Sequence, residues 1–308
     1  MTNNGLYHGL HHDLRHWLRL KPTPLILLLG LALSPAVVSA TNESFSSVPS
    51  SISSTFAELN ALTFADYQWI GQKIYQNECA GKPKYLTYWG PGESFPSFGI
   101  GHFIWHPKKM NNAMEETFTE TFPAMFEFIA KTAKPPEWLN SVFKNSDFVA
   151  PWSDKKEFDQ AWSNSELHQL RDWLLATQSQ QAQFIVLGFQ QRWSNEIQTL
   201  PNSQKRLLQP RLHRMMTFKK GLFAVVDYFN FKGIGANQKE QYQGQSWGLA
   251  SVLMAMDVLE TTSQDEYLEQ FVIAAKKRLQ LRVNLAPSER NEARWLKGWE
   301  VRLDQYLK

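Results

Sequence analysis

Cysteine is nearly absent from this chain of 308 residues, which contains only Cys79. A single cysteine excludes an intramolecular disulfide, so the fold has to depend on its buried core. Without residues 1–40 the chain is still 268 residues long, enough to bury a core without covalent cross-links. We also find no convincing internal repeat.

A strong excess of one charge is missing as well. Residues 1–40 carry three basic residues and one acidic residue, and the rest of the chain has 29 basic and 28 acidic residues, a net charge of +1. Nucleic-acid-binding domains normally show a marked basic excess. No block of lysines and arginines supplies one here, so we expect no nucleic-acid partner.

A long hydrophobic run is the third absence. The apolar stretch at 25–33 follows three basic residues, stops before Pro35, and is too short to span a bilayer. It precedes Val38, Ser39 and Ala40, small residues of the kind that signal peptidase cleaves after. The pattern predicts a signal peptide over residues 1–40 and a periplasmic or secreted protein without a stable membrane anchor. No cysteine follows that could carry a lipid.

The remaining chain divides into a leader and one domain. Residues 41–62 contain a serine-rich stretch and are expected to form a flexible leader. Residues 63–308 show no comparable break and predict a single, monomeric α+β domain that is mostly α, with a small β-hairpin lobe packed on many helices. Expected helices cover 112–129 with an interruption at Pro123, 153–162, 165–175, 180–197, 203–216, a segment starting at a Ser263/Glu266 capping box, and 289–306.

The first helix of the domain ends in a glutamate. Thr63 and Asp66 form a capping box at its start, and Gly81 is suited to its end. Glu78 therefore lies in the last turn, where the helix dipole disfavours a carboxylate and is expected to raise its pKa. Aromatic neighbours would act in the same direction. A carboxyl group that stays protonated near neutral pH is what acid-catalysed glycoside cleavage requires, although most glutamates at helix ends are simply surface residues.

Two β-prone runs follow this glutamate. The first covers residues 85–89, a Gly-Pro-Gly turn comes next, and the second, residues 95–104, contains Ser-Phe-Gly-Ile-Gly-His. This order, over residues 64–107, resembles the phage-type lysozymes of the lysozyme-like superfamily. The resemblance implies a lysozyme-like fold in which Glu78 is the catalytic acid and Ser97 helps to hold the attacking water. Gly99, Gly101 and His102 then match the strand that lines the cleft.

The resemblance has a gap at the second carboxylate. The family places an aspartate six residues before its threonine, and the corresponding residue here is Pro91. The nearest acid is Glu93, which we take as the candidate second catalytic carboxylate. The hairpin is also about four residues longer than in the family. Tyr88, Gly99 and His102 are the expected substrate-binding residues of this part of the chain.

A later stretch, residues 227–248, mixes glycines with polar and aromatic side chains. Glycan clefts use that mixture, and the substrate-binding candidates here are Asn230, Lys232, Glu240, Gln245 and Trp247. An equally weighted interpretation is a structured loop that caps a helix beginning near Ser246. The Gly-Ile-Gly at 233–235 follows a helical pattern rather than a strand, which argues against a phosphate loop. If Glu78 is not the acid, Asp227 and Glu240 are the alternatives.

Other chemistries fit less well. His102 and His106 have the spacing of a helical metal pair, but four residues of a strand span about 13 Å, too far to share one ion. Cys79 sits at a helix C-terminus, which raises rather than lowers a thiol pKa and disfavours thiol catalysis. Trp295 and Trp299 are four residues apart on one helical face and are expected in the core. We expect neither a metal nor a cofactor.

Three functional hypotheses remain. The first is an exported glycoside hydrolase that cleaves peptidoglycan or a related aminosugar polymer by general acid and base catalysis. The second is a non-catalytic glycan-binding or cell-envelope protein with the same fold, which the missing aspartate favours. The third is hydrolysis of another aminosugar polymer, such as chitosan. Whether Glu93 faces the same cleft as Glu78 separates the first two.

Overall fold

The computed structural model describes residues 56–107, 119–144, 148–236, 241–258 and 263–308. Its elements are mostly helices with two small antiparallel sheets, so the expectation of a mostly α, α+β chain is confirmed. The expected signal peptide over residues 1–40 lies outside the described residues. The helices, in chain order, are α2 Ala57–Asn60, α3 Phe64–Cys79, α5 Phe122–Ala130, α6 Glu137–Lys144, α7 Lys155–Gln160, α8 Ser165–Ala176, α9 Gln178–Glu196, α10 Asn202–Met216, α11 Lys219–Lys232, α12 Leu249–Ala255, α13 Gln264–Leu285 and α14 Ala293–Asp304.

The first sheet has three strands where the sequence predicted a two-stranded hairpin. They are β1 Thr87–Tyr88, β2 Ser97–Phe98 and β3 Phe103–Ile104, in the order β1-β2-β3, with Tyr88 opposite Ser97 and Ser97 opposite Ile104. The second β-prone run therefore turns back on itself. Gly99 has a φ of 73° and its carbonyl accepts the His102 N–H, so this segment forms a turn instead of continuing as one strand.

Residues 56–62 are not part of a flexible leader, which corrects that boundary. They include α2, and Phe56 and Leu59 are buried three residues apart on one side of it. The Phe56 ring packs edge-on against Phe189 of α9, with centroids 5.8 Å apart. This aromatic contact ties the short segment to α9.

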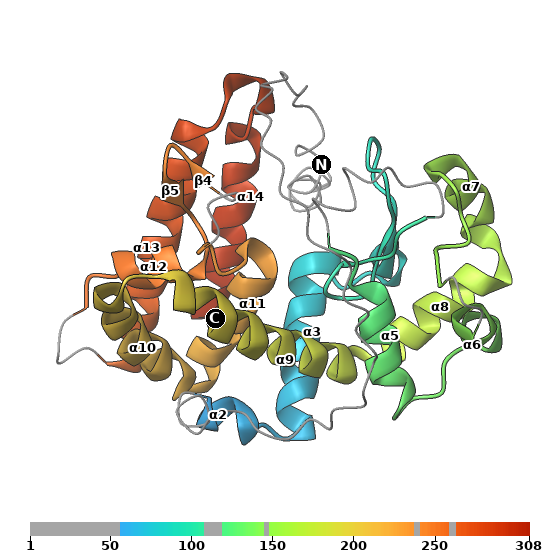
Figure 1. The fold of residues 1–308 in the computed structure, drawn as a ribbon, viewed down its shortest axis with the longest axis horizontal. Helices are drawn as coiled ribbons and strands as arrows, with labels where there is room; N and C mark the ends of the chain where they lie inside the picture. The colour runs from blue at the N-terminus through green and yellow to red at the C-terminus, as the bar shows by residue number, and fades with distance from the viewer. Residues whose placement is uncertain (1–55, 108–118, 145–147, 237–240, 259–262) are drawn as a thin grey trace, which may run out of the picture.

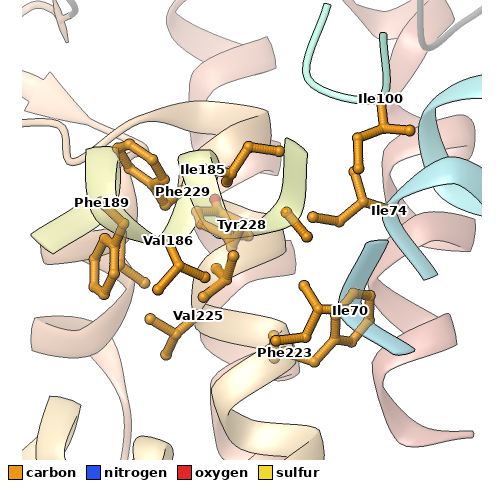
Figure 2. Close-up of a cluster of buried hydrophobic side chains, with 14 of the residues drawn as sticks. Ile70, Ile74, Ile100, Ile185, Val186, Phe189, Phe223, Val225, Tyr228 and Phe229 are labelled. Carbon is orange, nitrogen blue, oxygen red and sulfur yellow. The ribbon is translucent and has the colours of Figure 1, made fainter. Parts of the chain in front are cut away.

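Figure 1 shows α9 running across the molecule, from the side that holds the three-stranded sheet and α5–α8 to the side that holds α10–α14. Helix α3 packs closely against α9. A side chain at Gly71 would meet the Gln178 carbonyl at 2.6 Å, so only glycine allows this approach. Figure 2 shows Ile74 of α3 pointing toward α9, with Ile100 of the β2–β3 turn next to Ile74.

The sheet side of the molecule has an aromatic core. The ring centroid of Phe98, on β2, lies 5.7 Å from that of Trp105 and 5.0 Å from that of Phe122. Trp105 stacks on Phe122 with the ring centroids 4.6 Å apart. The sequence predicted that Pro123 interrupts a helix, but in the structure it does not. It stands in the first turn of α5, where the missing proline N–H costs nothing because it has no helical partner.

The other side is helical, with a second sheet of β4 Gln241–Tyr242 and β5 Gln245–Ser246. The capping box at Ser263 and Glu266 is present at the start of α13, as predicted. The expected last helix, 289–306, is instead divided by Asn291, which has a φ of 46°, into a short 3-10 turn Ser288–Arg290 and α14. Trp295 and Trp299 of α14 are buried, as expected.

One cluster of buried apolar residues extends from Phe56 to Tyr306 through both sides of the molecule. A continuous core of this kind is what a single domain requires. None of the helices in the described part of the chain combines the length and the apolar character of a transmembrane span.

Candidate functional site

The end of α3 places Glu78 inside the protein. The Thr63 hydroxyl accepts the Asp66 N–H while the Asp66 carboxylate accepts the Thr63 N–H, which fixes the start of the helix as the sequence predicted. The helix then ends at Cys79, because Ala80 and Gly81 take φ angles of 50° and 64°. Glu78, one residue before that end, has a side chain that is only 9% exposed.

Side chains from three other segments reach the Glu78 carboxylate. Its Oε1 lies 2.7 Å from Nη1 of Arg302 on α14 and accepts a hydrogen bond from Nδ2 of Asn230 on α11, at 3.1 Å. Its Oε2 lies 3.8 Å from Nε2 of His102, in the β2–β3 turn. Elements far apart in the chain therefore meet at this one carboxylate. Of the residues selected from the sequence, Glu78, Asn230 and His102 are brought together.

The β2–β3 turn holds His102 in this position. His102 has a φ of 48°, a left-handed conformation that few residues other than glycine adopt. Its Nδ1 lies 3.3 Å from the Ser97 hydroxyl, and the Ile100 N–H donates to Oε1 of Gln181 on α9. The turn is thus tied both to the sheet and to the central helix. Ser97, predicted to belong to the site, reaches Glu78 through His102.

Burial lowers the pKa of His102 below its ordinary value, although the Glu78 carboxylate acts in the opposite direction. The imidazole is consequently neutral at pH 7, and its approach to Glu78 is not a charge pair. Burial also raises the pKa of the Cys79 thiol well above its ordinary value. Cys79 donates to the Tyr85 carbonyl at 3.7 Å, and such a buried thiol is unreactive, in line with our rejection of thiol catalysis.

Arg302 is shared between two carboxylates. Its Nε and Nη2 donate to Oδ2 and Oδ1 of Asp227 on α11, both at 2.9 Å, while Nη1 faces Glu78. The Tyr306 hydroxyl also donates to Oδ2 of Asp227, at 2.6 Å. Burial alone would lower the pKa of Arg302, but Asp227 and Glu78 raise it well above its ordinary value. The guanidinium therefore stays charged at any physiological pH.

This arrangement differs from the expectation for Glu78. The sequence pointed to a helix dipole and aromatic neighbours, both of which favour a protonated carboxyl group. The structure instead places a cation 2.7 Å from it, and a nearby opposite charge favours the ionised form. The sequence did not indicate Arg302 as part of the site. It lies seven residues after Trp295 and three after Trp299, on the buried face of α14, and a charge on an apolar helical face is the signal that identifies it.

Glu93 lies in the turn between β1 and β2. Its Oε2 accepts the Gly90 N–H at 2.7 Å, and its backbone carbonyl accepts from Nε1 of Trp89 at 2.9 Å. The Glu93 carboxylate thus stabilises the turn that contains Pro91. Tyr88, on β1, is half-buried and is paired with Ser97 of β2, so it lies beside the site in the sheet register.

Two of the other predicted binding residues, Lys232 and Trp247, lie inside the protein. Lys232 is buried, with its ammonium 4.0 Å from the ring centroids of Phe231 and Trp299, and burial lowers its pKa well below the ordinary value. Trp247 is also buried, 4.7 Å from the Tyr242 ring. Glu240 lies outside the described residues. Neither Lys232 nor Trp247 is displayed on an open surface.

The glycine-containing segment before α12 caps that helix. The Gly233 and Ile234 carbonyls accept the N–H groups of Leu249 and Ala250, and Gly235 packs directly on Gly248. This supports the structural interpretation of the segment. Gln245 bonds to Arg278 and lines an open cleft of about 1020 Å³ between the β4–β5 hairpin, α12 and the chain after α9. Among the residues that the structure describes, neither Glu78 nor Asn230 lines this cleft.

Comparison with known proteins adds no assignment to this geometry: no family model, no curated protein and no solved structure matches the chain significantly.

Proposed function

We propose that the protein is a lysozyme-like glycoside hydrolase that cleaves peptidoglycan or a related aminosugar polymer. The observation that carries the proposal is the buried Glu78 carboxylate, which ends one helix and is reached by Asn230, Arg302 and His102 from three other segments. Buried carboxylates held by several polar groups cluster at catalytic sites. The resemblance of residues 64–107 to phage-type lysozymes assigns the acid to this same glutamate.

In the proposed reaction, Glu78 gives its proton to the glycosidic oxygen as the bond to the anomeric carbon breaks. Oε1 lies against Asn230 and Arg302, and in this proposal Oε2, which faces His102, carries the proton. A water molecule near the Ser97 hydroxyl adds to the anomeric carbon and loses a proton to a base. Glu93 is the candidate base, and its Oε2 accepts the Gly90 N–H in the structure.

A second candidate function is glycan binding without hydrolysis. Two observations favour it: the Glu78 carboxylate is ion-paired with Arg302, and the Glu93 carboxylate is bound to its own turn. Incubating the protein with peptidoglycan, chitin and chitosan and measuring the release of reducing ends separates these functions. Release from one polymer supports the hydrolase, while tight binding to a polymer without any release supports the binding protein.

The proposed location is the periplasm or the cell exterior, with the glycan polymer as partner and the protein acting as a monomer. The composition of residues 1–40 supports export. N-terminal sequencing of the exported protein should begin near Thr41, and an intact N-terminus would contradict this proposal.

A further inference from the structure

Arg302 lies between two buried carboxylates, and this arrangement bears on how Glu78 can hold a proton. Asp227 is fully buried and Glu78 is 9% exposed, while the Arg302 side chain between them is 1% exposed. A buried guanidinium in contact with a single carboxylate would keep that carboxylate ionised. A general acid held only by Arg302 would therefore be poorly suited to its task.

Asp227 is the principal partner of Arg302. It accepts two parallel hydrogen bonds from the guanidinium and a third from the Tyr306 hydroxyl, which is the bonding pattern of an ionised carboxylate. Glu78 faces only the remaining nitrogen, Nη1. The charge of Arg302 is thus already balanced by Asp227, and ionisation of Glu78 adds a second negative charge to one cation.

Other titratable groups surround this set. His102 faces Glu78 from the β2–β3 turn, and Cys79 is its neighbour on α3; burial keeps both neutral at pH 7. Tyr306 faces Asp227 from the end of the chain, and burial and Asp227 raise its pKa well above the ordinary value, so it is neutral too. Lys232, on α11, is buried near Arg302, and burial lowers its pKa well below the ordinary value.

We propose that Asp227 is a positioning residue that serves as the counter-charge of Arg302, so that Glu78 can take up and release a proton while Arg302 holds it in place. The inference rests on the proposed role of Glu78 as general acid. With Asp227 and Glu78 both ionised, the set with Arg302 carries a net charge of −1. One proton on Glu78 makes it neutral, which a buried environment favours. Tyr306 supports this role of Asp227 because its hydroxyl donates a hydrogen bond to the Asp227 carboxylate and holds it in place.

The test is the pH dependence of hydrolysis in Asp227→Asn, with Tyr306→Phe as the matched control. Asp227→Asn removes the counter-charge, so Arg302 holds Glu78 ionised and the alkaline limb of the pH–rate profile moves to lower pH, by roughly one pH unit. Tyr306→Phe removes one hydrogen bond to Asp227 but no charge, so its limb moves less. An unmoved limb in Asp227→Asn, or equal shifts in both variants, would overturn the proposal.

A second measurement separates this inference from the proposed function. Carboxyl-carbon NMR of labelled glutamate, assigned with Glu78→Gln, follows the titration of Glu78 without substrate. A lower midpoint in Asp227→Asn supports the counter-charge even if the protein hydrolyses no polymer, and an unchanged midpoint refutes it even if hydrolysis is found. If Asp227→Asn does not fold, Arg302→Gln is compared with the double variant Arg302→Gln/Asp227→Asn. Glu78 must then titrate at a higher pH in the single variant than in the double variant, because the single variant retains the Asp227 charge.

Discussion

Replacing Arg302 by methionine leaves two buried carboxylates without their cation. The side chain is 1% exposed and contacts Asp227, which is fully buried, and Glu78, which is 9% exposed. Removing one partner of such a buried pair typically costs about 3–5 kcal/mol of folding free energy. Methionine fills much of the same volume, so the expected loss at pH 7 comes mainly from the two carboxylates rather than from a cavity.

The pH dependence of this loss follows from the charges. Asp227 and Glu78 raise the pKa of Arg302 well above its ordinary value, so the guanidinium stays charged from about pH 4 to 9 and its own titration adds no pH dependence in this range. In the variant, the two unpaired carboxylates bind protons more readily in the folded state than in the unfolded state. The deficit relative to wild type should therefore shrink as the pH falls from 7 to 4.

Urea unfolding at pH 7 and at pH 4 measures both effects. Arg192→Met is the matched control, because Arg192 pairs with Glu196 on the surface of α9 with its side chain 48% exposed, and such pairs contribute at most about 1 kcal/mol. If Arg302→Met costs no more than Arg192→Met at pH 7, or if its deficit is the same at both pH values, the reasoning about this buried set is refuted.

Two further predictions concern the β2–β3 turn. Gly99→Ala should destabilise the protein, because the residue has a φ of 73° and a side chain there would contact Gln181. The control is Gly188→Ala in α9, where a side chain meets nothing within 4 Å, and it should stabilise the protein by about 0.5–1 kcal/mol. Equal effects of the two substitutions on thermal unfolding would contradict this prediction. His102 should titrate below the ordinary histidine value of about 6.5, so the stability that its neutral form provides is present above that pH and is lost as the pH falls; an imidazole NMR titration with a midpoint above 6.5 would disprove it.

Local signals in the sequence predicted the parts of the site that depend on neighbouring residues. The Thr63/Asp66 capping box and Gly81 mark the two ends of α3, and thereby the position of Glu78, and both were visible in the sequence, whereas the left-handed conformation of Ala80 was not. The Ser263/Glu266 box at the start of α13 was predictable for the same reason. Signals of this kind act within one helical turn, so they can be recognised without knowledge of the tertiary fold.

The partners of Glu78 were harder to predict because they depend on packing between distant helices. Asn230 was selected for its polar character, yet its contact with Glu78 spans 152 positions of the chain. Arg302 and Asp227 each lie on a helical face that is otherwise apolar, α14 and α11, and nothing local says that those faces meet. The β2–β3 turn was missed because residues 95–104 have the composition of one strand, while the positive φ at Gly99 reverses the chain.

The most direct test of the account is the rate of glycan hydrolysis by Glu78→Gln, measured together with its affinity for the same polymer. Glutamine keeps the shape and can still meet Asn230, but it has no proton to transfer. The loss of a general acid typically lowers the rate by about two to four powers of ten, so turnover should nearly disappear while binding persists. Hydrolysis at the wild-type rate by Glu78→Gln, on a polymer that the wild-type protein cleaves, would contradict the account and move the search for the acid to Asp227 or Glu240.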